Sequence, residues 1–207
     1  MVDKKHPHPL RPKAEWHSRG YLPHWEVGEE PQSITFRLAD SLPAEVRERL
    51  KAAKQEAKPD PTEQRKRFEE LLDSGHGEAL LRQPEVGRVV EDSLLHFDGQ
   101  RYRLHAWSVM PNHVHALATP INGHALSAIV HAWKSFTALQ INRLLGRQGS
   151  LWFPEYFDRK IRNERHFEAA RYYIEQNSVE ARLCAKAEEW PFSSAKRNLE
   201  RGLPVRS

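Results

Sequence analysis

Hydrophobic and polar positions alternate in several stretches of the chain in the way that strands require. Four stretches read as strands: residues 33–38, 102–109, 113–119 and 152–161. In the first, Ile34, Phe36 and Leu38 share one face, because side chains two apart in a strand point the same way. Pro111-Asn112 separates the second stretch from the third, so we expect these two strands to form an antiparallel hairpin.

Three further stretches repeat their hydrophobic residues at the spacing of an amphipathic helix. The first, residues 84–97, predicts a helix packed on the core. The second, residues 127–145, ends before Gly146, a typical helix cap. Its predicted inward residues are Ile129, Val130, Trp133, Phe136 and Leu144. The third helix carries Tyr173, and its predicted inward residues are Phe167, Ala170 and Ile174.

The order of these elements, β-α-β-β-α-β-α, predicts an α+β fold of the ferredoxin-like type. We expect an antiparallel sheet with helices on one face and an additional C-terminal helix that carries the tyrosine. Residues 1–32 are basic and rich in Pro and His, and they predict an irregular N-terminal arm. One domain then spans residues 33–195, with the ordered part ending at Trp190-Pro191-Phe192, and residues 196–207 form a C-terminal tail. Within the domain, residues 44–74 balance acidic and basic side chains, which is typical of a solvated helical stretch.

The composition restricts the classes of protein to consider. The 207 residues include 32 basic and 28 acidic side chains, an excess that suits a nucleic-acid-binding protein only if it gathers on one surface. The single cysteine, Cys184, excludes an intramolecular disulfide and a cysteine-rich zinc site, and it suits a reducing cytosol. There is no apolar run long enough for a membrane span and no signal-peptide pattern. We therefore expect a cytoplasmic protein without a membrane partner.

Two pairs of side chains could build one reaction centre. His113 and His115 are two apart in a strand, so both imidazoles project from one face and can bind one metal ion. Tyr173 and Asn177 are four apart on a helix and therefore share a face. A tyrosine oxygen near a divalent cation can attack a phosphodiester, and the Asn177 amide oxygen could be the third ligand. The alternatives are that the histidines are hydrogen-bonded core residues, that the tyrosine packs, and that Asn177 caps its helix.

Helical phase distinguishes the two adjacent tyrosines. At about 100° per residue, Tyr173 lies roughly 90° from the centre of the inward stripe, and Asn177 lies on the same side. Tyr172 lies nearly opposite the stripe. A nucleophile on the flank of a helix is supported by the core and still reachable by substrate, so Tyr173 is the expected catalytic residue.

Six motifs taken together resemble the HUH single-tyrosine transposases, and within them the REP-associated tyrosine transposases of bacteria. They are SRGYLPH at 18–24, ITFRLADSLP at 34–43, MPNHVHAL at 110–117, WFPEYFDR at 152–159, YYIEQN at 172–177 and WPFSS at 190–194. The family pattern of Tyr-Ile-x-x-Asn also selects Tyr173. One departure is Ser178, where the family usually has a proline that would help to stop the helix.

The resemblance implies a metal-dependent endonuclease and transposase domain that uses Mg²⁺ or Mn²⁺ and no small organic cofactor. Its expected ligands are His113, His115 and Asn177. Its implied substrate is single-stranded or hairpin DNA, cut and rejoined through a 5′-phosphotyrosine intermediate in DNA transposition. A monomer is expected, with a dimer as the alternative. Two other functions remain open: a hairpin-binding module without cleavage, and a metal-dependent phosphodiesterase that uses water.

Residues 134–171 hold eight basic side chains against four acidic ones, a local excess that equals that of the entire chain. Phosphate contact is the expected role for some of these cations. The candidates are Lys134, Arg143, Arg159, Lys160, Arg162 and Arg165. Nearby aromatic side chains could stack bases, although core packing is the stronger expectation for each; they are Trp107, Trp133, Trp152 and Phe153.

Overall fold

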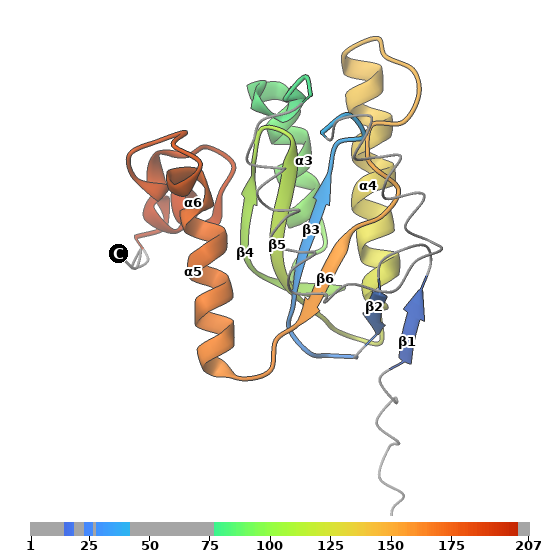
Figure 1. Ribbon diagram of the computed structural model, residues 1–207, viewed down its shortest axis with the longest axis vertical. Coiled ribbons are helices and arrows are strands. Elements are labelled where there is room, and N and C mark those ends of the chain that lie inside the picture. Colours follow the sequence, from blue (N-terminus) through green and yellow to red (C-terminus); the bar gives the residue numbers. More distant parts are fainter. Residues whose placement is uncertain (1–14, 19–22, 27, 42–76, 203–207) are drawn as a thin grey trace, which may run out of the picture.

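The computed structural model describes residues 15–18, 23–26, 28–41 and 77–202 (Figure 1). The first fourteen residues of the predicted arm and the whole of the charged stretch 44–74 lie outside the described residues. Residues 15–26 hold two short paired strands, β1 (Glu15–Ser18) and β2 (Pro23–Glu26), where the sequence had predicted irregular chain.

A four-stranded antiparallel sheet forms the centre of the molecule, with the strand order β4-β5-β3-β6. Its strands are β3 (Gln32–Arg37), β4 (Tyr102–Val109), β5 (His113–Pro120) and β6 (Phe157–Lys160). Three of the predicted strands are confirmed to within a residue or two at each end. The fourth is shorter than predicted, because Trp152 forms only an isolated bridge with Leu38 before the chain reaches β6.

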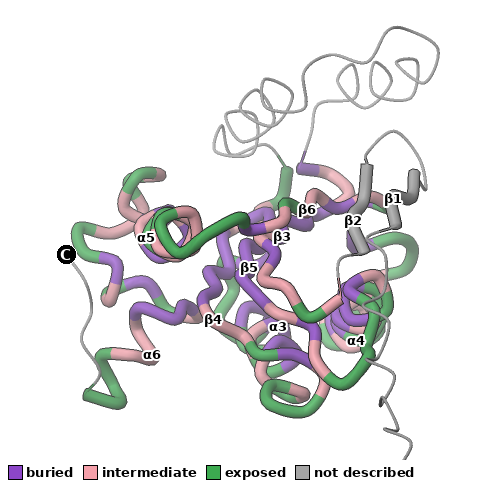
Figure 2. The backbone as a smooth tube through the Cα atoms, turned by 90° about the horizontal axis from the view of Figure 1, so that it is seen from below, coloured by how far each residue is buried: buried purple, intermediate pink, exposed green. Residues whose placement is uncertain are grey.

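Helices cover both faces of the sheet (Figure 2). They are α3 (Pro84–His96), α4 (Leu126–Leu144), α5 (Glu164–Glu180) and α6 (Ser194–Glu200), with short 3₁₀ turns at Leu80–Arg82 and Ala187–Glu189. The α+β class and the predicted element order are confirmed. No helix in the described ranges combines the length and apolar character needed to cross a membrane.

The main hydrophobic core lies between α3, α4 and one face of the sheet. Phe36 of β3 and Val114 of β5 are buried there against Trp133 of α4. A smaller cluster lies on the opposite face, where Ile174 of α5 is fully buried against Ala106 and Leu117. The helix that carries Tyr173 therefore packs on the face that also bears the odd-numbered residues of β5.

Two side chains of α4 that were predicted to point inward do not. Phe136 is 51% exposed and Leu144 is 50% exposed. The buried stripe of α4 runs instead through Ile129, Trp133 and Thr137 to Ile141, because only this side of the helix faces the sheet. The inward prediction for Phe136 and Leu144 was wrong.

The end of the described chain also differs from the prediction. The ordered region does not stop at Trp190-Pro191-Phe192, since α6 follows and takes up the start of the predicted tail. The Ser193 side chain begins this helix by accepting a hydrogen bond from the Lys196 amide. The tyrosine-bearing α5 is therefore not the last helix of the chain.

Candidate active site

The two histidines lie at the start of β5, on the face of the sheet that α5 covers. Val114, between them, is buried in the main core on the other face. Across the sheet, His115 pairs with Thr35 of β3 and His113 pairs with Arg37. The prediction that both imidazoles share one face is confirmed, and both are buried, at 1% and 2% exposed.

The Nε2 nitrogens of the pair lie close together. The Nε2 atoms of His113 and His115 are 2.9 Å apart, with the ring planes nearly perpendicular at 85°. Two nitrogens bound to one ion at about 2.1 Å and at right angles to each other would be about 3 Å apart. The spacing of the pair therefore suits chelation of a single cation with little side-chain movement.

Two polar neighbours orient the imidazoles, and sequence reasoning assigned neither a role. The Nδ1 atom of His113 lies 2.7 Å from the amide oxygen of Asn112, which only accepts, so this Nδ1 carries a hydrogen and donates it. Its Nε2 lone pair is then available to a metal. His115 Nδ1 lies 2.8 Å from the Thr35 hydroxyl, which can donate or accept and so permits either tautomer. Asn112 and Thr35 both lie inside the motifs named above, and their place in these motifs is the sequence feature that could have pointed to them.

Burial keeps His113 neutral. Burial is the larger cause and the nearby positive charge of Arg37 the smaller one, and together they lower the pKa of His113 from its ordinary value to about 3. A neutral imidazole is the form that binds metal. The site therefore does not have to release a proton from His113 before a cation can enter at neutral pH.

This depressed pKa predicts a stability that falls in acid. Below about pH 6.5 the unfolded chain takes up a proton at His113, whereas the folded chain does not until about pH 3. Between these two pH values, His113 lowers the free energy of unfolding by about 1.4 kcal/mol for each unit by which the pH falls. Urea unfolding in chelator at pH 7, 6 and 5 should therefore show the stability of the wild type falling relative to His113→Asn. An unchanged difference between the two proteins would contradict the burial of a neutral His113.

Helix α5 brings Tyr173 to the histidines and carries Asn177 four residues further on. The Tyr173 ring lies 5.6 Å from the His115 ring, centroid to centroid, and is partly buried. Tyr172 is 51% exposed, as its helical phase predicted. The Asn163 side chain fixes the start of α5 by accepting a hydrogen bond from the His166 amide.

Asn177 does not cap its helix. Helix α5 continues to Glu180 despite Ser178, so Asn177 lies inside the last turn, and its backbone carbonyl accepts from the Ala181 amide. The side chain is 1% exposed, and its Oδ1 atom is buried without a hydrogen-bond partner. A buried amide oxygen without a partner costs about 1–3 kcal/mol, and a bound cation is one group that would satisfy it.

The donor set fits a cation only if Asn177 takes part. No group of three or more His, Cys, Asp or Glu side chains in the described ranges could hold a metal ion. Two neutral nitrogens and one amide oxygen would leave further positions for water and phosphate, which is the pattern of a catalytic site. The chemistry of these three donors is therefore of the kind that a divalent ion accepts.

The predicted DNA-contacting cations do not form one cluster. Arg159 and Lys160 lie in β6, paired with the beginning of β3, while the histidines pair with its end. Arg162 and Arg165 follow at the exposed start of α5. Arg143 is exposed near the end of α4. The Lys134 ammonium donates to the carbonyls of Phe153 and Pro154 at 2.9 and 2.7 Å.

The aromatic candidates for base stacking pack in the core, which confirms the stronger of the two expectations for them. Trp107, Trp133, Trp152 and Phe153 are all at most 9% exposed. The Trp133 indole donates to the Tyr102 hydroxyl and the Trp152 indole to Thr137, both at 2.9 Å. Their polar edges are therefore used within the fold.

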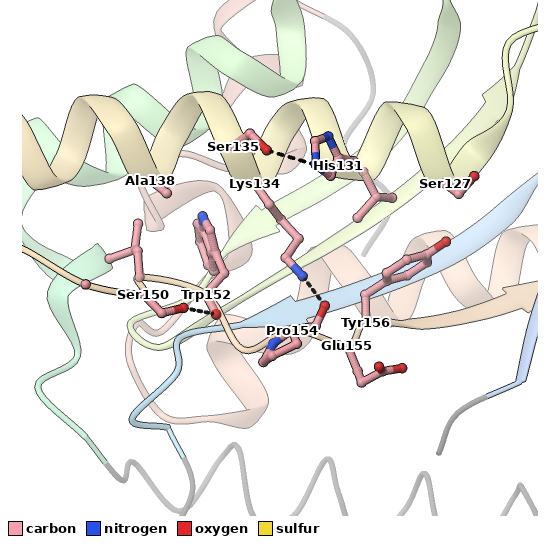
Figure 3. Close-up of a pocket in the computed structure, with 13 residues that line it drawn as sticks. Ser127, His131, Lys134, Ser135, Ala138, Ser150, Trp152, Pro154, Glu155 and Tyr156 are labelled. Atoms are coloured by element: carbon pink, nitrogen blue, oxygen red, sulfur yellow. Dashed lines mark hydrogen bonds between the residues drawn. The ribbon is translucent and has the colours of Figure 1, made fainter. Parts of the chain in front are cut away.

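A hollow of about 300 Å³ lies away from this site, between α4 and residues 149–156 (Figure 3). Its lining includes His131, Lys134, Trp152 and Glu155. Burial lowers the pKa of Lys134 to about 8, against the opposing effect of the Glu155 charge. Neither the two paired histidines nor Tyr173 and Asn177 line this hollow, so it is not the candidate active site.

Part of the chain matches the model of a known protein family. Residues 94–177 match the family described as Transposase IS200 like, and this segment includes both histidines, Tyr173 and Asn177. The resemblance to single-tyrosine transposases that the motifs indicated is therefore confirmed.

Two particular proteins are similar to this chain. The REP-associated tyrosine transposase of Escherichia coli (strain K12) is 28% identical over 102 residues, which cover 49% of this chain and 59% of that protein. The chain thus matches less than two thirds of the length of this relative. A solved structure of a REP-associated tyrosine transposase bound to a REP hairpin superposes with a TM-score of 0.58 at 18% identity, covering 88% of this chain and 86% of the other. This second likeness confirms the fold.

Proposed function

We propose that this protein is an HUH single-tyrosine endonuclease and transposase that cuts one DNA strand and transfers it through a 5′-phosphotyrosine intermediate. The observation that carries this proposal is the convergence of the two Nε2 atoms, 2.9 Å apart, beside the ring of Tyr173. The partnerless amide oxygen of Asn177, on the same helix, supports it. The match to the IS200-like transposases covers the whole of this set.

Tyr173 is the nucleophile in this reaction. Its phenolic oxygen attacks the scissile phosphorus, the bond from phosphorus to the 3′ oxygen breaks, and the 3′ oxygen leaves as a hydroxyl. The 5′ phosphate stays on the tyrosine, so the energy of the bond is conserved and a second 3′ hydroxyl can reclaim the strand. This chemistry suits strand transfer better than degradation.

His113, His115 and Asn177 would hold Mg²⁺ or Mn²⁺. When bound, the ion would act as a Lewis acid that neutralises phosphate charge and stabilises the departing oxygen. The protein contributes a fixed pair of neutral imidazoles, with Asn112 and Thr35 setting their orientation. The buried position of the histidines keeps bulk water away from the reacting atoms.

The proposed substrate is a single-stranded or hairpin DNA of the REP type. The similar solved structure is described as bound to a REP hairpin. A single strand can bring its phosphate to a side chain between α5 and the sheet more easily than a duplex can. We expect the chain to act as a monomer, because the histidines and Tyr173 meet within one copy.

Asn177 gives a graded test of the metal site. Asn177→Ala removes one oxygen ligand and keeps both imidazoles, so cleavage should fall at low Mn²⁺ and recover partly as Mn²⁺ is raised. Asn177→Asp keeps the ligand geometry and adds charge, so it should retain more activity than the alanine variant. Cleavage rates across a Mn²⁺ titration, with melting curves for both variants, check this. A loss that Mn²⁺ does not rescue would remove Asn177 from the ligand set.

The proposed reaction is tested by incubating the protein and Mn²⁺ with single-stranded hairpins from the DNA that flanks its own gene. A denaturing gel should show a covalent protein–DNA adduct. Binding without any product would favour a hairpin-binding module. Free cut ends without an adduct would favour a phosphodiesterase that uses water.

A further inference from the structure

The WPFSS motif at residues 190–194 docks on the free edge of the sheet. β4 is the edge strand, and its Ser108 forms an isolated bridge with Ser193. The Val109 amide donates to the Phe192 carbonyl at 3.1 Å, and the Trp190 indole donates to the Val109 carbonyl at 3.0 Å. The motif therefore extends the sheet by a short stretch beside β4.

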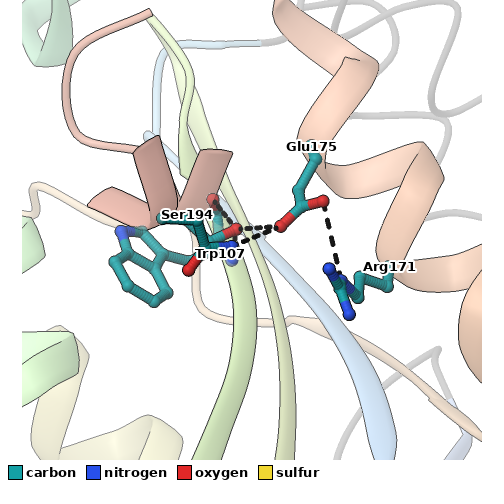
Figure 4. Close-up of polar contacts among 5 residues, drawn as sticks. Trp107, Arg171, Glu175 and Ser194 are labelled. Atoms are coloured by element: carbon teal, nitrogen blue, oxygen red, sulfur yellow. Dashed lines mark hydrogen bonds and ion pairs between the residues drawn. The ribbon is translucent and has the colours of Figure 1, made fainter. Parts of the chain in front are cut away.

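The last residue of the motif connects this edge to the tyrosine helix (Figure 4). The Ser194 hydroxyl accepts from the Trp107 amide at 3.2 Å and donates to the Glu175 carboxylate at 3.0 Å. The Asn198 side chain donates to the same carboxylate oxygen at 3.3 Å. The other carboxylate oxygen lies 3.6 Å from Arg171, one turn earlier on α5. Glu175 and Ser194 are 5% and 1% exposed, so this network is buried.

Burying a carboxylate carries a large desolvation penalty, so it is an unfavourable way to attach a helix to a sheet. Replacing buried charged groups by apolar ones of similar volume is often neutral or stabilising, so stability alone does not explain Glu175. What an apolar contact lacks is direction, whereas a hydrogen bond fixes both distance and angle. Apart from the fully buried Ile174, the apolar contacts of α5 with the sheet come from partly buried residues such as Phe167 and Ala170.

The residues of this network are close in sequence to those of the proposed reaction centre. Glu175 lies midway in sequence between Tyr173 and Asn177. Trp107, to which it connects through Ser194, precedes Ser108, the cross-strand partner of His115. Trp107, where the network reaches the sheet, is therefore next in sequence to the residue that pairs with His115. A slide of α5 by one turn, about 5.4 Å, would carry Tyr173 away from His115.

From these contacts we propose that the WPFSS motif and Glu175 form a positioning clamp that fixes the height and rotation of α5, so that Tyr173 and Asn177 meet the histidine pair. Glu175 and Ser194 are positioning residues in this assignment. The proposal rests on the proposed function, and it gives a role to a motif that the proposed chemistry leaves unused.

Single-turnover cleavage at saturating hairpin and Mn²⁺ tests the clamp. Glu175→Ala and Ser194→Ala should each slow adduct formation by at least about tenfold with unchanged hairpin affinity, because small displacements of reacting groups can cost about 100-fold. Glu175→Gln keeps an acceptor for Ser194 and Asn198, so it should stay within about threefold of wild type. Val90→Ala, a cavity variant in α3 far along the chain from the site, controls for lost stability. It should cleave at the wild-type rate at a temperature where all the proteins are folded.

Hydrogen exchange separates failure of the clamp from failure of the proposed function. Glu175→Ala should speed exchange in the α5 amides relative to those of α4, whether or not the protein cuts DNA. If the wild type forms no adduct, the proposed function fails, and the exchange result alone decides on the clamp. Cleavage by Glu175→Ala at the rate of Val90→Ala, or unchanged α5 exchange, would overturn the clamp.

Discussion

Tyr173→Phe should reduce cleavage of a hairpin substrate to below about 10⁻⁴ of the wild-type rate, because removing a nucleophile typically costs several orders of magnitude. Only one oxygen is lost from a partly buried ring, so folding and the packing against His115 should survive. Hairpin affinity should also survive, since it rests mainly on phosphate and base contacts. Adduct formation on a denaturing gel and hairpin binding by gel shift measure the two effects separately.

Tyr172→Phe is the matched control. It makes the same chemical change one residue earlier, on a side chain that is 51% exposed and faces away from the histidines. This variant should cut nearly normally. If Tyr172→Phe lost activity and Tyr173→Phe kept it, the assignment of the nucleophile would be reversed.

Removing the proposed metal ligands should have an effect of similar size. His113→Ala and His115→Ala each break a pair whose Nε2 atoms are 2.9 Å apart, and one remaining imidazole is a weak site for Mg²⁺ or Mn²⁺. Each variant should lose cleavage and keep hairpin binding. Excess chelator should stop the wild type in the same way, and added Mn²⁺ should restore it.

His124→Ala controls for the loss of a histidine as such, because His124 is exposed in the turn before α4. It should cleave like the wild type at every Mn²⁺ concentration. Cutting that persists in excess chelator would remove the metal from the mechanism, whatever the histidine variants do.

Much of the fold could be predicted because local patterns dominate it. The alternation around Ile34 and Phe36 and the hairpin around Asn112 follow from short-range periodicity, and the sheet uses both as predicted. The same two-residue period placed His113 and His115 on one face without any knowledge of distant contacts. Helical phase likewise separated Tyr173 from Tyr172.

What could not be predicted depends on contacts between residues far apart in the chain. Apolar residues occur on more than one side of α4, so the sequence pattern alone could not show which side faces the sheet. Phe136 and Leu144 were predicted to be inward, but the sheet packs against a different stripe. The bond between Thr35 and His115 spans 80 positions. The link from Ser194 to Glu175 depends on a motif that docks on β4 only after the sheet exists.

Mapping the covalent adduct tests the central claim most directly. The wild-type protein is allowed to react with a hairpin and Mn²⁺, the DNA is digested to a short remnant, and tryptic peptides are sequenced by tandem mass spectrometry. We predict that the peptide Tyr172–Arg182 gains the mass of a 5′-linked nucleotide and that the fragment ions place it on Tyr173. A nucleotide on Tyr172 or on any other residue, or cut DNA with no modified peptide, would contradict the account.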